Sequence, residues 1–98
     1  MNVRHASRVT ERLDTDATYA AGYSEAVVTA FRKRMQLIRS ATTEQDLRNL
    51  KSLHYEKLEG KRKGQRSMRL NDQFRLILKI EDTPNGPQVV VIEITDYH

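Results

Sequence analysis

Two different spacings of apolar residues divide the chain into a helical half and a strand half. Between residues 24 and 42 they recur every three or four positions, as on one face of an α-helix: Val27, Phe31, Met35, Ile38 and Ala41. Ser24 is a typical N-cap residue, and Glu25 follows it at the positive end of the helix dipole. The spacing therefore predicts a core helix over about 24–41 with a basic outer side.

Weaker helical signals flank this core helix. A short helix is expected over about 7–13. Thr42 followed three positions later by Gln45 is typical of a capping box, which predicts a second short helix running to Leu50. Residues 51–64 are then predicted to form a polar connection.

After residue 64 the apolar period changes to two, which indicates strands with one buried face. The first strand holds Met68 and Leu70, the second covers 74–80 and the third covers 88–95, with a proline-containing loop over 82–87. Short loops between them predict an antiparallel meander with the helices on one face. An N-terminal strand over 2–6 would add a fourth. We therefore expect an α+β fold: a sheet of three to four strands packed against two to three N-terminal helices.

Length and composition narrow the class of protein. Ninety-eight residues without repeats or linkers predict one domain over 1–98. The chain has no cysteine, which excludes disulfides and thiolate metal sites. No apolar run approaches the roughly 18 residues of a membrane span, and no signal-peptide core follows Met1. We expect a cytoplasmic protein with no membrane partner.

The net charge of +4 is unevenly placed. Residues 80–98 hold four acids and no lysine or arginine, whereas residues 57–79 are strongly basic. The basic residues of that segment are Lys57, Lys61, Arg62, Lys63, Arg66, Arg69, Arg75 and Lys79. Cations clustered on consecutive strands favour a nucleic-acid partner.

Strand direction brings candidate chemistry together. In a meander the third strand ends where the second begins, so Asp96, Tyr97 and His98 should come close to Arg75. By side-chain parity, Arg75 and Arg69 should project from the face that the helices leave uncovered.

The set suits cleavage of RNA by its own 2′-OH, which needs a base, an acid and cations. Histidine exchanges protons near neutral pH, arginine grips phosphate with a fork, and tyrosine donates a hydrogen bond or stacks on a base. The three histidines lack metal-ligand spacing, so no metal or cofactor is expected.

Three features together resemble the HigB toxins of the RelE/ParE superfamily, the plasmid-maintenance killer proteins of type II toxin–antitoxin systems. They are the Gly-x-Arg-x-Gly loop at 60–64, the Asn-x-x-aromatic-Arg turn at 71–75 and the terminal Asp96-Tyr97-His98. The resemblance implies a ribosome-dependent mRNA endonuclease (mRNA interferase) that cleaves codons in the A site and inhibits translation.

The resemblance also assigns roles and partners. His98, Tyr97, Asp96 and Arg75 would be catalytic. RNA would be held by the loop and strand cations Lys57, Lys61, Arg62, Lys63, Arg66 and Arg69. The partners would be ribosome and mRNA, together with a HigA-like helix-turn-helix antitoxin that links the toxin indirectly to operator DNA.

The chain departs from some relatives at two positions, and other readings stay open. Glu59 stands where such relatives carry a lysine, and His54 is displaced relative to the loop, so Lys57 or Lys61 would substitute. One alternative is a ParE-like DNA gyrase poison without nuclease activity, which has no need of His98. Another is an inactive member kept for antitoxin binding or regulation.

Overall fold

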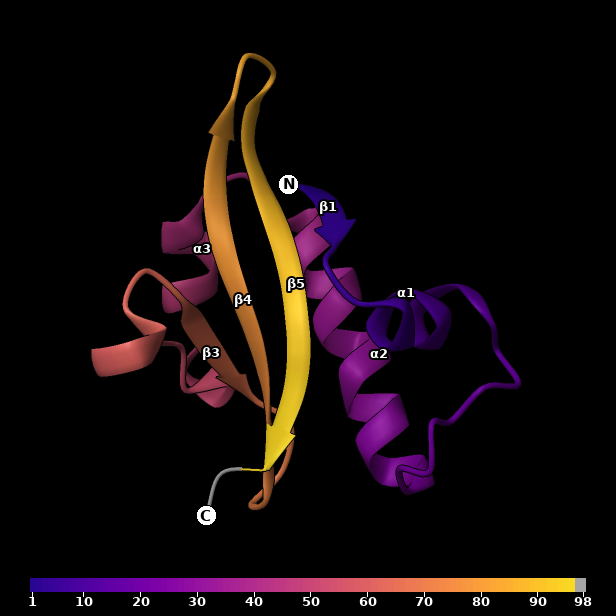
Figure 1. Cartoon of the computed structure of the whole chain (residues 1–98). Helices are drawn as coiled ribbons and strands as arrows, with labels where there is room; N and C mark the ends of the chain where they lie inside the picture. The colour runs from indigo at the N-terminus through magenta and orange to yellow at the C-terminus, as the bar shows by residue number, and fades with distance from the viewer. Residues whose placement is uncertain (97–98) are drawn as a thin grey trace.

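A five-stranded mixed sheet with helices on one face forms the centre of the protein (Figure 1). The computed structural model describes residues 1–96, so the expectations for Tyr97 and His98 lie outside the described residues. In chain order the elements are β1 (Asn2–His5), α1 (Arg8–Thr15), α2 (Glu25–Ser40), α3 (Glu44–Arg48), the 3-10 helix η1 (Lys51–Leu53), β2 (Glu56–Lys57), the 3-10 helix η2 (Gly60–Arg62), β3 (Arg66–Arg69), β4 (Phe74–Thr83) and β5 (Gly86–Asp96). Across the sheet the strand order is β1-β5-β4-β3-β2.

The predicted meander of β3, β4 and β5 is confirmed, with antiparallel neighbours throughout. The N-terminal strand is also confirmed and pairs in parallel with β5. The strand count exceeds the prediction by one, because β2 pairs with β3 at the far edge. A strand of two residues is too short to leave an alternating pattern in the sequence.

One face of this sheet is apolar and packs against α1, α2 and α3 (Figure 1). Its fully buried residues include Met68, Leu76, Leu78, Val89 and Val91. Facing them, α2 contributes Val27, Phe31, Met35 and Ile38, as its spacing predicts. We call the opposite side of the sheet the outer face.

The predicted loop over 82–87 is wrong, because both strands continue into it. β4 extends to Thr83 and β5 begins at Gly86, which leaves a tight turn of Pro84 and Asn85. The Thr83 hydroxyl donates to the Gly86 carbonyl at 2.7 Å, and Gly86 adopts a φ of 105° that favours glycine.

The helices largely follow the prediction, with one shift of register. The Ser24 hydroxyl accepts a hydrogen bond from the Val27 amide at 3.3 Å and begins α2 as expected. The capping box at Thr42 and Gln45 is wrong by one residue: Thr43 is the N-cap of α3 and Asp46 supplies the carboxylate. Within residues 1–96, no helix is both long enough and apolar enough to cross a membrane.

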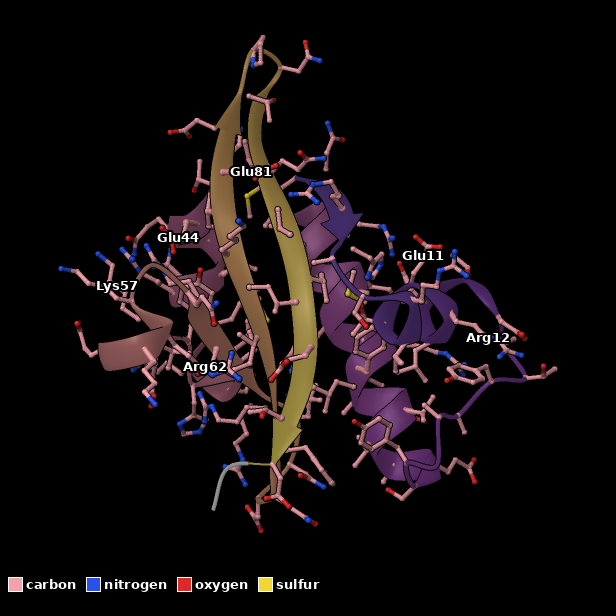
Figure 2. All side chains as sticks on the ribbon, viewed as in Figure 1. Glu11, Arg12, Glu44, Lys57, Arg62 and Glu81 are labelled. Atoms are coloured by element: carbon pink, nitrogen blue, oxygen red, sulfur yellow. The ribbon has the colours of Figure 1, made fainter. Side chains whose placement is uncertain are left out.

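The segment predicted as a polar connection is structured. Leu53 in η1 is fully buried in the core, and Glu44 at the start of α3 and Lys57 of β2 lie on the β2 side of the sheet (Figure 2). The rest of this segment crosses toward the outer face. That face is therefore partly covered, although no α-helix formed by residues 1–96 lies on it.

Candidate active site

Arg75 is a buried arginine on the outer face near the start of β4. It is only 9 % exposed. Its Nε donates to the hydroxyl of Ser67 at 2.9 Å, and its Nη2 donates to the carbonyl of His54 at 2.6 Å. The carboxylate of Glu56 lies 4.0 Å from the same Nη2. Two hydrogen bonds at different edges fix the plane of the guanidinium, as a phosphate-binding fork requires.

The acceptors of Arg75 were not identified from the sequence. Ser67 is fully buried on β3, on the same face as Arg75, and parity on neighbouring strands could have suggested it. His54 contributes its backbone, and a carbonyl contact leaves no signal in the sequence. Its φ of 46° is in the left-handed region, which costs a non-glycine residue about 1 kcal/mol or more.

The predicted meeting of β5 with the start of β4 is confirmed. Thr95 is paired with Arg75, and Asp96 is paired with Phe74. Paired residues point to the same face, so Asp96 lies on the side of Phe74, away from Arg75. Its carboxylate accepts a hydrogen bond from Gln73 Nε2 at 2.9 Å.

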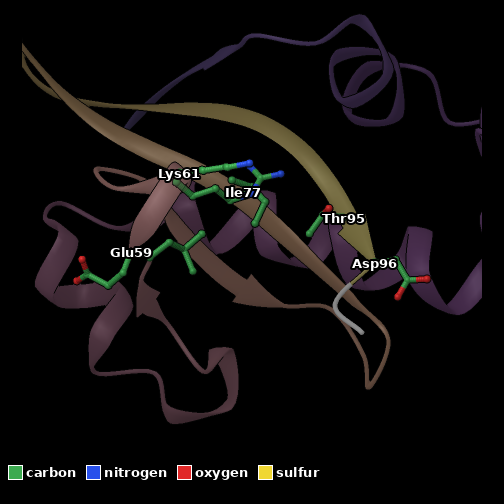
Figure 3. A pocket seen from close by; sticks show the side chains of 7 residues that line it. Glu59, Lys61, Ile77, Thr95 and Asp96 are labelled. Atoms are coloured by element: carbon green, nitrogen blue, oxygen red, sulfur yellow. The ribbon is translucent and has the colours of Figure 1, made fainter.

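A cavity of about 470 Å³ lies on the outer face beside this strand end (Figure 3). Its lining residues are Leu58, Glu59, Lys61, Arg62, Ile77, Thr95 and Asp96. Ile77 is fully buried at its base, while the carboxylates of Glu59 and Asp96 point away from its centre (Figure 3). The volume falls within the range of small-molecule sites.

Arg62 holds the loop that forms one wall of the cavity. Its Nη2 lies 2.6 Å from the carboxylate of Glu93 on β5, and its Nη1 donates to Gln65 at 2.9 Å. Gly60 and Gly64 flank the loop with positive φ values of 66° and 91°. Lys61 and Lys63 are exposed on it, as expected for loop cations.

Arg69 lies beside Arg75, and Arg34 contacts Arg69. Arg69 is directly opposite Arg75 on β3 and forms an ion pair with Asp72. Like charges directly opposite each other destabilise a sheet, and here the Asp72 carboxylate offsets the charge of Arg69. Arg34 of α2, which the sequence analysis missed, donates from Nε to the Arg69 carbonyl at 3.0 Å. Burial, and then the charge of Arg69, lowers the pKa of Arg34.

Two of the predicted RNA-binding residues lie elsewhere. Arg66 follows the alternation of β3 onto the helix face, where its Nε donates to Glu44 at 2.7 Å. Lys57 is exposed on the edge strand β2, opposite Arg66. The structure therefore gathers Arg62, Arg69 and Arg75 with Lys61 around the outer face and separates Arg66 from them. Among residues 1–96, no three histidine or acidic side chains are grouped as metal ligands would be.

Solved structures with the same architecture include a bacterial toxin. The YoeB/ParE toxin from Agrobacterium tumefaciens has a TM-score of 0.61 at 16 % identity, covering 100 % of both chains. The YoeB chain of the YoeB-YefM complex from Staphylococcus aureus has a TM-score of 0.60 at 17 % identity, covering 100 % of this chain and 97 % of that one. A conserved hypothetical protein from Helicobacter pylori has a TM-score of 0.55 at 13 % identity, covering 99 % and 94 %. At these identities the likeness establishes the fold.

The fold is therefore that of the small α+β toxins. A family model described as the RelE-like toxin of the type II toxin–antitoxin system HigB matches residues 7–98. The chain belongs to this family of HigB-like toxins, which confirms the resemblance found in the sequence. No curated protein matches the chain.

Proposed function

We propose that this toxin is a ribosome-dependent mRNA endonuclease that uses the 2′-OH of its RNA substrate as the nucleophile. The observation that carries the proposal is the buried, doubly hydrogen-bonded Arg75 beside the cavity at the end of β5. A fixed guanidinium is positioned to stabilise charge on a phosphoryl group in the transition state. Its family membership supports the same activity.

The reaction would need no external nucleophile. The 2′-oxygen attacks the adjacent phosphorus while a base takes its proton, and the bond from phosphorus to the 5′-oxygen breaks as an acid protonates that oxygen. The products are a 2′,3′-cyclic phosphate and a 5′-hydroxyl. We assign the phosphoryl contact to Arg75 and the proton transfers to His98, with Tyr97 assisting. Asp96, whose side chain lies on the side of Phe74, would act by positioning the end of β5.

Covalent connectivity supports the assignment of His98. Asp96 is fixed beside Phe74 by the β4–β5 ladder. His98 is two residues further along the chain. The start of β4, which carries Arg75, lies at the same end of the sheet as Asp96.

We further propose a partner that holds the toxin in check. The similar toxin from Staphylococcus aureus is seen in a complex with YefM. For this chain we propose a HigA-like antitoxin with a helix-turn-helix fold, through which the toxin would associate indirectly with operator DNA. Ribosome and mRNA would be its targets in the cytoplasm.

A ParE-like gyrase poison is the second candidate, since the description of the similar Agrobacterium toxin includes ParE. The shared fold does not separate the two activities. A gyrase poison would require neither His98 nor the orienting contacts of Arg75. The two candidates therefore predict opposite responses to loss of His98.

Mapping of mRNA ends tests the proposal directly. The purified toxin is mixed with ribosomes programmed with a defined mRNA, and we expect cuts within the vacant codon that leave 2′,3′-cyclic phosphate ends. His98→Gln should lower the single-turnover rate by roughly 10² to 10⁴, the contribution of an acid–base residue. Intact mRNA alongside inhibited DNA supercoiling by gyrase would instead establish the second candidate.

A further inference from the structure

The Arg62–Glu93 ion pair places a carboxylate on the surface that the proposed function gives to RNA. Glu93 is paired with Ile77 across β5 and β4, and Thr95 of the same strand face is paired with Arg75. The Glu93 carboxylate lies 2.6 Å from Nη2 of Arg62, which lines the cavity. A negative charge here opposes the approach of a phosphate backbone unless Arg62 neutralises it.

The pair is built so that it can be exchanged. The two side chains are 38 % and 44 % exposed, and half-exposed ion pairs contribute little to stability. Arg62 lies on a loop between Gly60 and Gly64, which have positive φ values and tolerate rearrangement. A carboxylate and a phosphodiester present the same pair of oxygens to a guanidinium, so they compete for the same donors.

We propose that Glu93 is an internal competitor of the RNA phosphate for Arg62, so that RNA must displace the Glu93 carboxylate to bind. The inference rests on the proposed function, because it requires RNA on the outer face. Its consequence is selectivity: an RNA that makes few other contacts cannot displace Glu93. A ribosome-bound mRNA, which also reaches Arg75 and the loop lysines, can do so.

The chain offers a matched control for this pair. Glu81 lies on β4 near the hairpin end, while Arg62 lies toward the opposite end of the sheet (Figure 2). Glu81 forms its own pair with Arg4, at 3.4 Å, and its side chain is 36 % exposed. Glu81→Gln therefore makes the same change in net charge through the same kind of pair, away from the cavity.

Binding is measured without cleavage on ribosomes whose mRNA carries 2′-O-methyl riboses through the vacant codon. Glu93→Gln should tighten binding roughly two- to fivefold, the range expected for an exposed pair, while Glu81→Gln stays close to wild type. Thermal unfolding verifies that both variants are folded. Glu93→Asp, which keeps the charge but shortens the reach, should fall between wild type and Glu93→Gln.

The salt dependence of binding distinguishes exchange from simple repulsion. In the wild type, Arg62 replaces a counterion on the phosphate, and the displaced Glu93 carboxylate attracts a counterion in turn. This contact therefore causes no net release of counterions. In Glu93→Gln the release is complete, and the slope of log Kd against log salt should steepen by about 0.7. In an Arg62→Gln background, the same Glu93→Gln change should leave the slope unaltered.

The outcomes separate the inference from the proposed function. Equal affinities and slopes for Glu93→Gln and Glu81→Gln, with mRNA still cut, overturn the inference alone. Weaker binding by Glu93→Gln also overturns the inference. It would show that the ion pair instead holds the 60–64 loop in the conformation that binds RNA. Failure of the wild type to bind programmed ribosomes or cut mRNA overturns both.

Discussion

Arg75 combines burial with charge, and two of its contacts fix the orientation of its guanidinium. The acceptors at Nε and Nη2 are a hydroxyl and a carbonyl, both neutral, so these two contacts orient the guanidinium without cancelling its charge. A carboxylate in the place of Ser67 would have orientated it equally well but would have competed with substrate. The carboxylate of Glu56 lies farther away, at 4.0 Å from Nη2.

Replacing Arg75 with lysine separates charge from geometry. Lysine keeps the charge but cannot hydrogen-bond to Ser67 and His54 while also presenting a planar fork, so we expect the single-turnover cutting rate to fall roughly 10²-fold. Arg69→Lys is the matched control on the neighbouring strand, where the side chain is paired with Asp72. Equal losses for the two variants would contradict a special role for Arg75.

Individual site residues were predictable where they depend on strand parity and direction. Arg75 and Arg69 share the outer face, and β5 ends beside Phe74, as alternation and topology dictate. The contacts of those residues were not predictable. The carbonyl of His54 reaches Arg75 only because η1 ends in a left-handed turn, and such a turn depends on packing across the whole segment.

The segment between α3 and β3 shows why short elements escape sequence patterns. Its 3-10 helices and the two-residue β2 have no repeating apolar positions, and Gly60 and Gly64 suggested an open loop. What orders its first part is a set of polar contacts around Glu44. The Tyr55 hydroxyl donates to Glu44 at 2.6 Å, and Arg66 donates to the same oxygen at 2.7 Å.

These contacts also explain the direction in which the pKa values of Tyr55 and Glu44 are shifted. Burial, together with the hydrogen bond to Glu44, raises the pKa of Tyr55, so its hydroxyl remains a donor throughout the physiological range. Burial alone would raise the pKa of Glu44, but the hydrogen bonds from Tyr55 and Arg66 outweigh it and lower that pKa. The segment is thus fastened to α3 and β3 by one ionised carboxylate.

Tyr55→Phe tests this fastening. A hydrogen bond to a charged acceptor contributes more than a neutral one, so we expect the free energy of unfolding to fall by roughly 1 to 3 kcal/mol in urea titrations. Tyr19→Phe is the control, because the ring of Tyr19 lies under Arg12, 4.1 Å from its guanidinium carbon, and this contact does not need the hydroxyl. A Tyr55→Phe variant as stable as Tyr19→Phe would show that the segment is held by its apolar contacts alone.

The whole fold was more predictable than its details because one core dominates it. The 3.6-residue period of α2 and the two-residue period of β3, β4 and β5 independently select the residues that meet in that core. The parallel pairing of β1 with β5 came from no local pattern. This pairing makes β1 the edge strand beside β5 and places His5 in contact with α1.

A buried polar cluster links the N-terminal elements. His5 on β1 contacts Thr10 at 3.0 Å and Asp14 at 2.9 Å, and Arg39 of α2 donates two hydrogen bonds to the Asp14 carboxylate. The hydrogen bond from Arg39 has the largest effect on the pKa of Asp14. Together with His5 it outweighs burial and lowers that pKa. Three elements therefore depend on one carboxylate being ionised.

This dependence predicts acid sensitivity of the folded protein. A carboxyl whose pKa is lowered on folding contributes stability above its unfolded pKa of about 3.9, and this contribution is lost as pH falls through the folded pKa. We therefore expect the free energy of unfolding to decline below about pH 5, with Asp14 contributing at most about 1.4 kcal/mol per pH unit to the slope.

Arg39→Gln should make that decline shallower, because it removes the main cause of the lowered pKa while leaving Asp14 in place. It should also lower stability at pH 7, where the contact is fully formed. Arg12→Gln is the matched control: Arg12 lies 3.6 Å from Asp16, whose pKa is lowered chiefly by its hydrogen bonds with Thr18. Urea titrations at pH 7 and at about pH 3.5 give both quantities for each variant. If Arg39→Gln keeps the wild-type slope, the acid response of the fold arises outside the Asp14 cluster.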